Sequence, residues 1–263
     1  MAFASLPLSL GALVGVGLSG GFVWWEVGRY ATPQVPESLF DERRELFGYT
    51  AGLFVGVPIA LAFILFALSM VNGALLSALL FLGVLVGSTE VAQWALLRSR
   101  FWGGSESGPF YALGYRAAIG GIVALALVTQ YFGATNPTPD GIALAVIESV
   151  AVVALEVAGA LLSMRAAPGS GRLGGGPLSG AIFGAVGFFL LGLGTIAGEA
   201  TAYGGALVAL FGALLVYRRL RPILAAVPPP SKGPPPARPV TTGAYGRTDR
   251  PSPSPSGRPS DKR

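Results

Sequence analysis

The feature that most constrains this sequence is a series of apolar runs, each about long enough to cross a bilayer as a helix. About 20 mostly apolar residues are needed for one crossing. Seven runs qualify: 5–25, 47–71, 74–97, 110–132, 142–164, 178–198 and 202–217. We divide the stretch 47–97 because it is too long for one crossing and because Asn72-Gly73 is a strong turn signal. The sequence therefore predicts an all-α fold, a polytopic membrane bundle of seven transmembrane helices.

The composition favours the same class. Hydrophobic residues make up 52% of the chain and charged residues 12%, with a mean hydropathy of +0.63. Soluble domains carry about 25% charged residues, so an ordinary soluble enzyme is excluded. We expect the lipid bilayer to be the main partner of the chain, and no nucleic acid.

The basic residues between the runs predict the orientation. They fall only on alternate connections and after the last run: Arg29, Arg43, Arg44; Arg98, Arg100; Arg165, Arg172; Arg218, Arg219, Arg221. Lys and Arg concentrate in cytoplasmic loops. We therefore expect a multi-pass protein of the cell membrane with its N-terminus outside and its C-terminus in the cytoplasm.

Two segments outside the runs have their own composition. Residues 222–263 hold seven of the 18 Lys and Arg and two of the 13 acids, and they are rich in proline, which predicts a disordered cytoplasmic tail beyond a membrane domain at 1–221. Just before the tail, Arg218, Arg219 and Arg221 are expected to meet anionic lipid headgroups. The segment 36–47 predicts a short helix on the cytoplasmic surface that leads into the second span, or a surface where a partner docks.

Several kinds of chemistry are excluded by residue type. The chain has no Cys and no His, so it lacks the ligands and bases of most metal and nucleophilic sites. All four aspartates, Asp41, Asp140, Asp249 and Asp261, lie outside the spans, which argues against a paired-aspartate protease. No phosphate-binding glycine motif is present. We expect no enzyme activity, no cofactor and no metal.

Four ionisable residues fall inside the spans: Glu90, Arg116, Glu148 and Glu156. Charges within a bilayer are costly and by default mark functional sites. At a rise of 1.5 Å per residue, Glu90, Arg116 and Glu156 lie at similar depths on three helices, so Arg116 is predicted to pair with Glu90 or Glu156. Glu148 lies nearer the outside, eight residues before Glu156 on the same helix.

Glycines spaced four apart suggest where helices approach each other closely, because they share one helix face. The pairs are Gly11/Gly15, Gly17/Gly21, Gly52/Gly56, Gly83/Gly87, Gly180/Gly184 and Gly194/Gly198. They predict a compact bundle, and they leave a second copy of the chain or another protein open as a partner.

Two functions are compatible with these features. The first is a small transport or channel-like protein in which Glu148 and Glu156 line an ion path with Glu90 and Arg116. The second is a non-catalytic scaffold or subunit of a larger membrane complex, in which an ion pair of Arg116 only fixes the positions of the helices.

Overall fold

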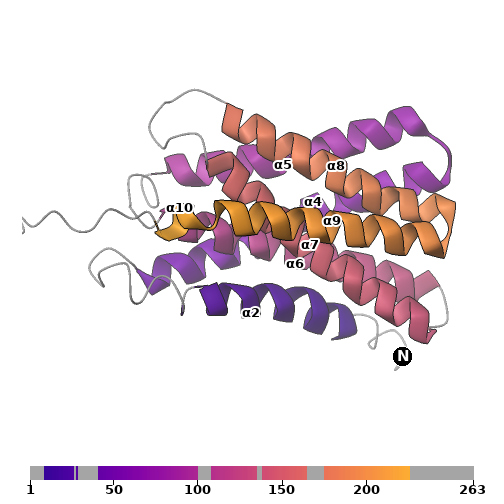
Figure 1. Cartoon of the computed structure of the whole chain (residues 1–263), viewed down its shortest axis with the longest axis horizontal. Coiled ribbons are helices and arrows are strands. Elements are labelled where there is room, and N and C mark those ends of the chain that lie inside the picture. The colour runs from indigo at the N-terminus through magenta and orange to yellow at the C-terminus, as the bar shows by residue number, and fades with distance from the viewer. Residues whose placement is uncertain are drawn as a thin grey trace, which may run out of the picture. The chain divides into compact units, whose positions relative to one another are not determined.

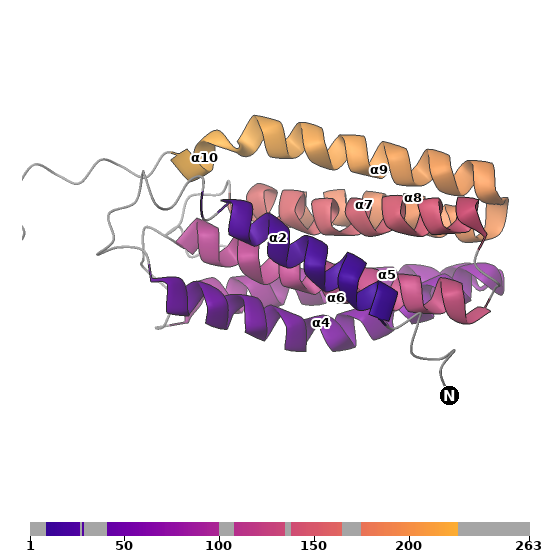
Figure 2. The same ribbon diagram turned by 90° about the horizontal axis from the view of Figure 1, so that it is seen from below.

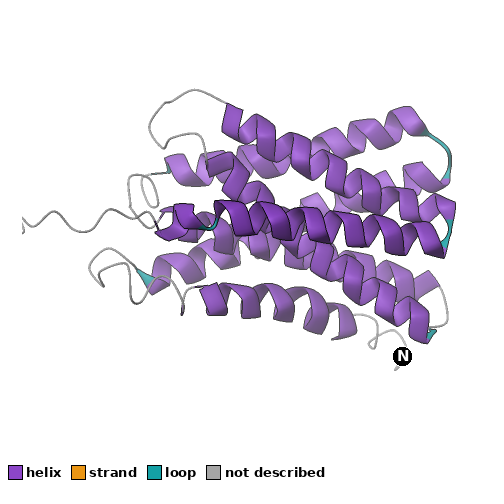
Figure 3. Ribbon diagram, in the orientation of Figure 1, coloured by secondary structure: helices purple, strands orange, loops and turns teal. Residues whose placement is uncertain are grey.

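The computed structural model describes residues 9–26, 28, 41–99, 108–134, 138–164 and 175–225, and the regular elements in these ranges are all helices (Figure 3). The prediction of an all-α fold is confirmed for them. In chain order the elements are the π-helical segment η1 (Ala12–Val16), α2 (Gly17–Glu26), α4 (Glu42–Val71), α5 (Leu75–Arg98), α6 (Gly108–Ala134), α7 (Pro139–Met164), α8 (Gly175–Ala197), α9 (Glu199–Leu220) and α10 (Pro222–Ala225).

Six of these helices, α4 to α9, are long and apolar enough to cross a membrane. They correspond to the last six predicted spans. The first predicted span, 5–25, overlaps helical residues 9–26, where η1 and α2 follow each other. Because α2 alone has 10 residues, it is too short to cross by itself. The count of seven spans and the orientation of the chain stay predictions.

The helices form a bundle with α6 and α7 at its centre (Figures 1 and 2). On one side α6 contacts α4 and α2, and on the other α7 contacts α8 and α9, while α5 bridges α4 and α8. In an apolar window of 18 residues, 78% of the residues are buried in α6, against 22% in α9. Aromatic side chains fill part of the core, where the rings of Phe63 and Phe188 are 5.9 Å apart. Side chains on α6 therefore have protein on all sides.

The turn predicted at Asn72-Gly73 is confirmed. Gly73 has a φ of +68°, in the left-handed region that favours glycine, and the amide of Ala74 donates to the carbonyl of Ser69 over 2.9 Å. This turn makes α4 and α5 antiparallel neighbours. The N-terminus of α4 and the C-termini of α5 and α9 consequently lie at one end of the bundle, together with α10 (Figure 1).

Two predicted boundaries need correction. Residues 42–47 do not form a separate surface helix but the start of α4, where the side chain of Asp41 caps the amide of Arg43 at 2.9 Å; the rest of that segment, 36–40, lies outside the described residues. Residues 222–225, predicted as tail, form α10, and Leu224 is fully buried. Burial of the apolar side chain of Leu224 against the bundle explains why the helical part extends past Arg221. The tail beyond 225 lies outside the described residues.

Candidate functional site

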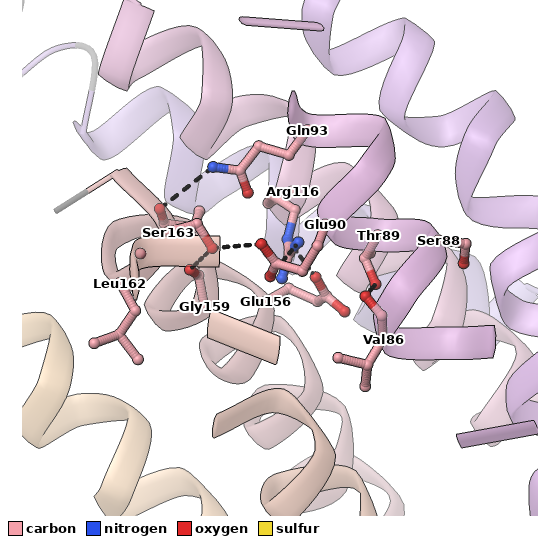
Figure 4. Close-up of polar contacts among 12 residues, drawn as sticks. Val86, Ser88, Thr89, Glu90, Gln93, Arg116, Glu156, Gly159, Leu162 and Ser163 are labelled. Carbon is pink, nitrogen blue, oxygen red and sulfur yellow. Dashed lines mark hydrogen bonds and ion pairs between the residues drawn. The ribbon is translucent and has the colours of Figure 1, made fainter. Parts of the chain in front are cut away.

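The structure brings three of the four intramembrane candidates together. Arg116 of α6 lies between Glu90 of α5 and Glu156 of α7 (Figure 4). Its Nη1 is 3.1 Å from Glu90 Oε1, and its Nε is 2.6 Å from Glu156 Oε2. All three residues are at least 93% buried. We call Glu90, Arg116 and Glu156 the charge cluster.

Neighbouring polar groups complete the charge cluster. Ser163 Oγ lies 2.5 Å from Glu90 Oε2 and 2.8 Å from the carbonyl of Gly159, so its single proton is offered to one of two acceptors. One turn along α5 from Glu90, the amide of Gln93 donates to the carbonyl of Ala160 over 3.3 Å. Glu90 is thus held by groups from both α6 and α7.

Glycines make the room that the charge cluster needs. A Cβ at Gly159 would lie 2.7 Å from Arg116 Nη2, and one at Gly120 would lie 3.3 Å from the side chain of Glu156. At Gly180 of α8, a Cβ would come within 2.9 Å of Glu90 Oε1. Because glycine has no Cβ, these positions of α6, α7 and α8 leave the space that the large polar side chains occupy.

The charge cluster contains two carboxylates and one guanidinium. If all three groups are ionised, one negative charge is left over inside the bundle. An isolated buried charge is strongly disfavoured, and such groups are normally neutralised by a partner or a proton. The cluster therefore has the composition of a site that takes up one positive charge.

Glu148, the fourth candidate, lies apart from the charge cluster. It is partly exposed on α7, and its position eight residues before Glu156 corresponds to about 12 Å along the helix. Among the described residues it makes no ion pair with Arg116.

The predicted glycine pairs divide into two groups. Gly11, Gly15, Gly52, Gly56, Gly180 and Gly194 each lie so close to another helix that a Cβ would meet an atom at or below 3.0 Å, and Gly184 makes an ordinary contact with Val86 at 3.7 Å. At Gly17, Gly21, Gly83 and Gly87 a Cβ would meet nothing within 4 Å. Gly198 caps α9 with a φ of +89°, so it shares no helix face with Gly194, and that predicted pair is wrong.

The structure contains a second buried acidic region, which is not among the candidates predicted from the sequence. Glu45 of α4 and Glu26 of α2 are 6% and 2% exposed, although both lie outside the predicted spans. Glu45, Gly48, Gly52 and Gly56 are all buried and recur every three or four residues. This spacing is the signal that places Glu45 on the inner face of α4.

The part of the chain that the structure describes contains no group of three metal-ligating side chains. No known protein family, no curated protein and no solved structure matches this chain. The geometry of the buried charges is therefore the feature of this chain that bears on its function.

Proposed function

We propose that this chain is a non-enzymatic, multi-pass protein of the cell membrane that moves protons or small cations through the interior of its helix bundle. The charge cluster is the internal site, and Glu148 is a second carboxylate of the path, nearer the outside. In this proposal the bundle has seven spans, with the N-terminus outside and with Arg218 and Arg219 against anionic headgroups on the cytoplasmic side.

The observation that carries the proposal is the excess of one carboxylate over cations in the charge cluster. Arg116 is shared by Glu90 and Glu156 at 3.1 and 2.6 Å. A proton or cation that binds the cluster neutralises this excess charge, and it competes with the guanidinium for the carboxylate that it binds. Intramembrane carboxylates of this kind form proton relays in pumps and transporters.

Glu148 extends the proposal toward one end of the bundle. It lies on the same helix as Glu156, and unlike Glu156 it is partly exposed. The separation of about 12 Å is too long for a direct transfer, so intervening water or polar groups must connect the two carboxylates.

The test is flux through the purified full-length protein in liposomes that contain a pH-sensitive dye, with ion-sensitive dyes in parallel. The parent protein is expected to dissipate an imposed gradient, and Glu148→Gln and Glu156→Gln are each expected to abolish that flux. Asp140→Asn is the matched control, because Asp140 is an exposed acid in the first turn of the same helix. Liposomes with the parent protein that are as tight as empty ones would contradict the proposal.

The second candidate is a membrane subunit or scaffold, and a separate observation favours it. Gly83 and Gly87 share an exposed face of α5, and a Cβ at either would meet nothing within 4 Å among the described residues. Small residues in such a pattern allow a second helix to approach closely.

Oligomeric state in detergent or nanodiscs tests the second candidate. Gly83→Leu is expected to shift an oligomer toward the monomer, whereas Gly204→Leu, at an equally open position of α9, is expected to leave it unchanged. A parent protein that is monomeric at all concentrations would exclude self-association through this face.

A further inference from the structure

The second acidic region lies where the ends of α2, α4 and α6 meet. A narrow crevice there is lined by Glu26 and apolar residues of α2, by Glu45 of α4, and by Phe110, Leu113 and Gly114 of α6. Apart from the two glutamates its walls are apolar. We call this region the Glu45 crevice.

The carboxyl group of Glu45 is closely enclosed in the crevice. It lies against the bare Cα of Gly114, where a Cβ would overlap Oε1 and lie 3.0 Å from Cδ. Neither oxygen of Glu45 accepts or donates a hydrogen bond within the described part of the chain. The position of Gly114 therefore makes room for the carboxyl group without supplying a partner for it.

The charged and titratable groups of the surrounding helices have other partners. On α2, Glu26 accepts a hydrogen bond from the hydroxyl of Tyr217 of α9. On α6, Arg116 is engaged by the charge cluster, and the hydroxyl of Tyr111 accepts from the amide of Asp41 at 3.0 Å.

The charged residues of α4 other than Glu45 lie outside the crevice. Arg44 is 3.4 Å from the carboxylate of Asp41, and both side chains are at least 40% exposed. Glu42 and Arg43 are exposed. No described cation thus forms an ion pair with Glu45, and the other titratable residue that lines the crevice is a second acid, Glu26.

The dimensions of the crevice decide which cation fits. It has no space large enough for a water molecule. Metal cations need several oxygen ligands, six to eight for Ca²⁺ and an octahedral set for Mg²⁺, and the apolar walls do not offer them. A proton needs neither space nor further ligands.

We propose that Glu45 is a proton-binding site: its carboxyl group carries a proton while this end of α2 lies against α4 and α6. An ionised Glu45 must be hydrated, and water reaches it only when the crevice opens. The proton then passes to the entering water, so its release is coupled to a movement of α2. This site is separate from the charge cluster, and the proposal does not depend on ion flux.

Infrared spectroscopy of the full-length protein in lipid nanodiscs tests the proposal, because the C=O stretch of a neutral carboxyl group is resolved from that of a carboxylate. At neutral pH the parent protein is expected to show a neutral carboxyl band, and Glu45→Gln should remove the part of that band that Glu45 contributes. Glu42→Gln is the matched control, since Glu42 is an exposed residue in the same helical turn, and it should leave the band intact. An unchanged band in Glu45→Gln would overturn the proposal.

Two further measurements separate the remaining outcomes. Addition of Na⁺, K⁺ or Mg²⁺ at constant pH should not diminish the band; a loss would show that a metal cation replaces the proton and would overturn the proposal. Glutamine resembles the neutral acid in shape and charge, so Glu45→Gln should fold, and its melting temperature should fall less than that of the parent as the pH rises. The parent and Glu42→Gln should lose stability, because folding binds a proton that becomes scarcer. A Glu45→Gln protein that fails to fold, or that melts with the pH dependence of the parent, would contradict the proposal.

Discussion

The charge cluster and the Glu45 crevice involve residues of α6 that are close in sequence, yet the buried acids in the two regions are stabilised in different ways. Arg116 provides a guanidinium for Glu90 and Glu156, whereas two residues earlier Gly114 provides only space for Glu45. Two residues along a helix correspond to a rotation of 200°, so the two regions lie on opposite sides of α6. A buried acid is stabilised either by a cation or by its own proton, and this helix contains both arrangements.

Loss of the cation should have the largest effect. In Arg116→Gln both carboxylates lose their partner, and breaking a buried pair typically costs about 3–5 kcal/mol, part of which is recovered if a carboxylate takes up a proton. Reversible unfolding in mixed micelles measures this loss. Adding Glu156→Gln to Arg116→Gln should restore part of the stability, and a single variant as stable as the parent would show that the ion pairs do not stabilise the bundle.

Filling the space at Gly114 should have the next largest effect. Gly114→Ala places a methyl group on the carboxyl of Glu45, and overpacking of this kind costs about 1–3 kcal/mol. The double variant Gly114→Ala with Glu45→Ala should recover most of the loss in the same unfolding measurement. Gly83→Ala is the control: it faces open space, so the better helix propensity of alanine should leave stability equal or raise it by up to about 1 kcal/mol. If Gly114→Ala and Gly83→Ala changed the stability equally, Gly114 would not be needed to make room for Glu45.

The chain after α9 packs against residues of α6 that also line the Glu45 crevice. Leu224 of α10 is fully buried in a cluster that includes Phe110 and Leu113. Truncation after Arg221 should therefore cost up to about 3 kcal/mol, the contribution of one fully buried leucine. Truncation after Val227 should leave the melting temperature unchanged. If both truncations behave alike, Leu224 does not stabilise this end of the bundle.

The smallest effect on stability is expected at Glu148. It is partly exposed and lies outside the charge cluster, so Glu148→Gln should change stability by no more than about 0.5 kcal/mol, as is usual for substitutions away from buried networks. A comparison of melting temperatures with the parent protein tests this. A large loss would mean that Glu148 has a buried partner like that of Glu156.

The helices could be predicted from the sequence to within a few residues because apolar runs and turn signals are local properties. The predicted second span starts at 47, five residues after α4 begins, since hydropathy locates the apolar part of a helix and not its capped, charged first turns. For the same reason, hydropathy predicts 42–47 as a surface segment and gives no sign that Glu45 is buried.

The contacts of the charged residues could be predicted only in part. The rise per residue gives the depth of Glu90, Arg116 and Glu156, but not which helices are neighbours. The sequence therefore left the choice between the two acids open, and the structure shows Arg116 in contact with both. Glycines have the same limitation, because spacing identifies a common face at Gly52/Gly56 and at Gly83/Gly87 but not what lies opposite it.

The charge cluster conducts a cation or proton, whereas Glu45 binds a proton outside that path. Proton flux in liposomes tests this assignment most directly when Glu156→Gln and Glu45→Gln are compared side by side with the parent. We expect the parent and Glu45→Gln to dissipate an imposed pH gradient at the same rate, and Glu156→Gln to be as inactive as empty liposomes. Flux that survives in Glu156→Gln, or that is lost in Glu45→Gln, would contradict this assignment of the two regions.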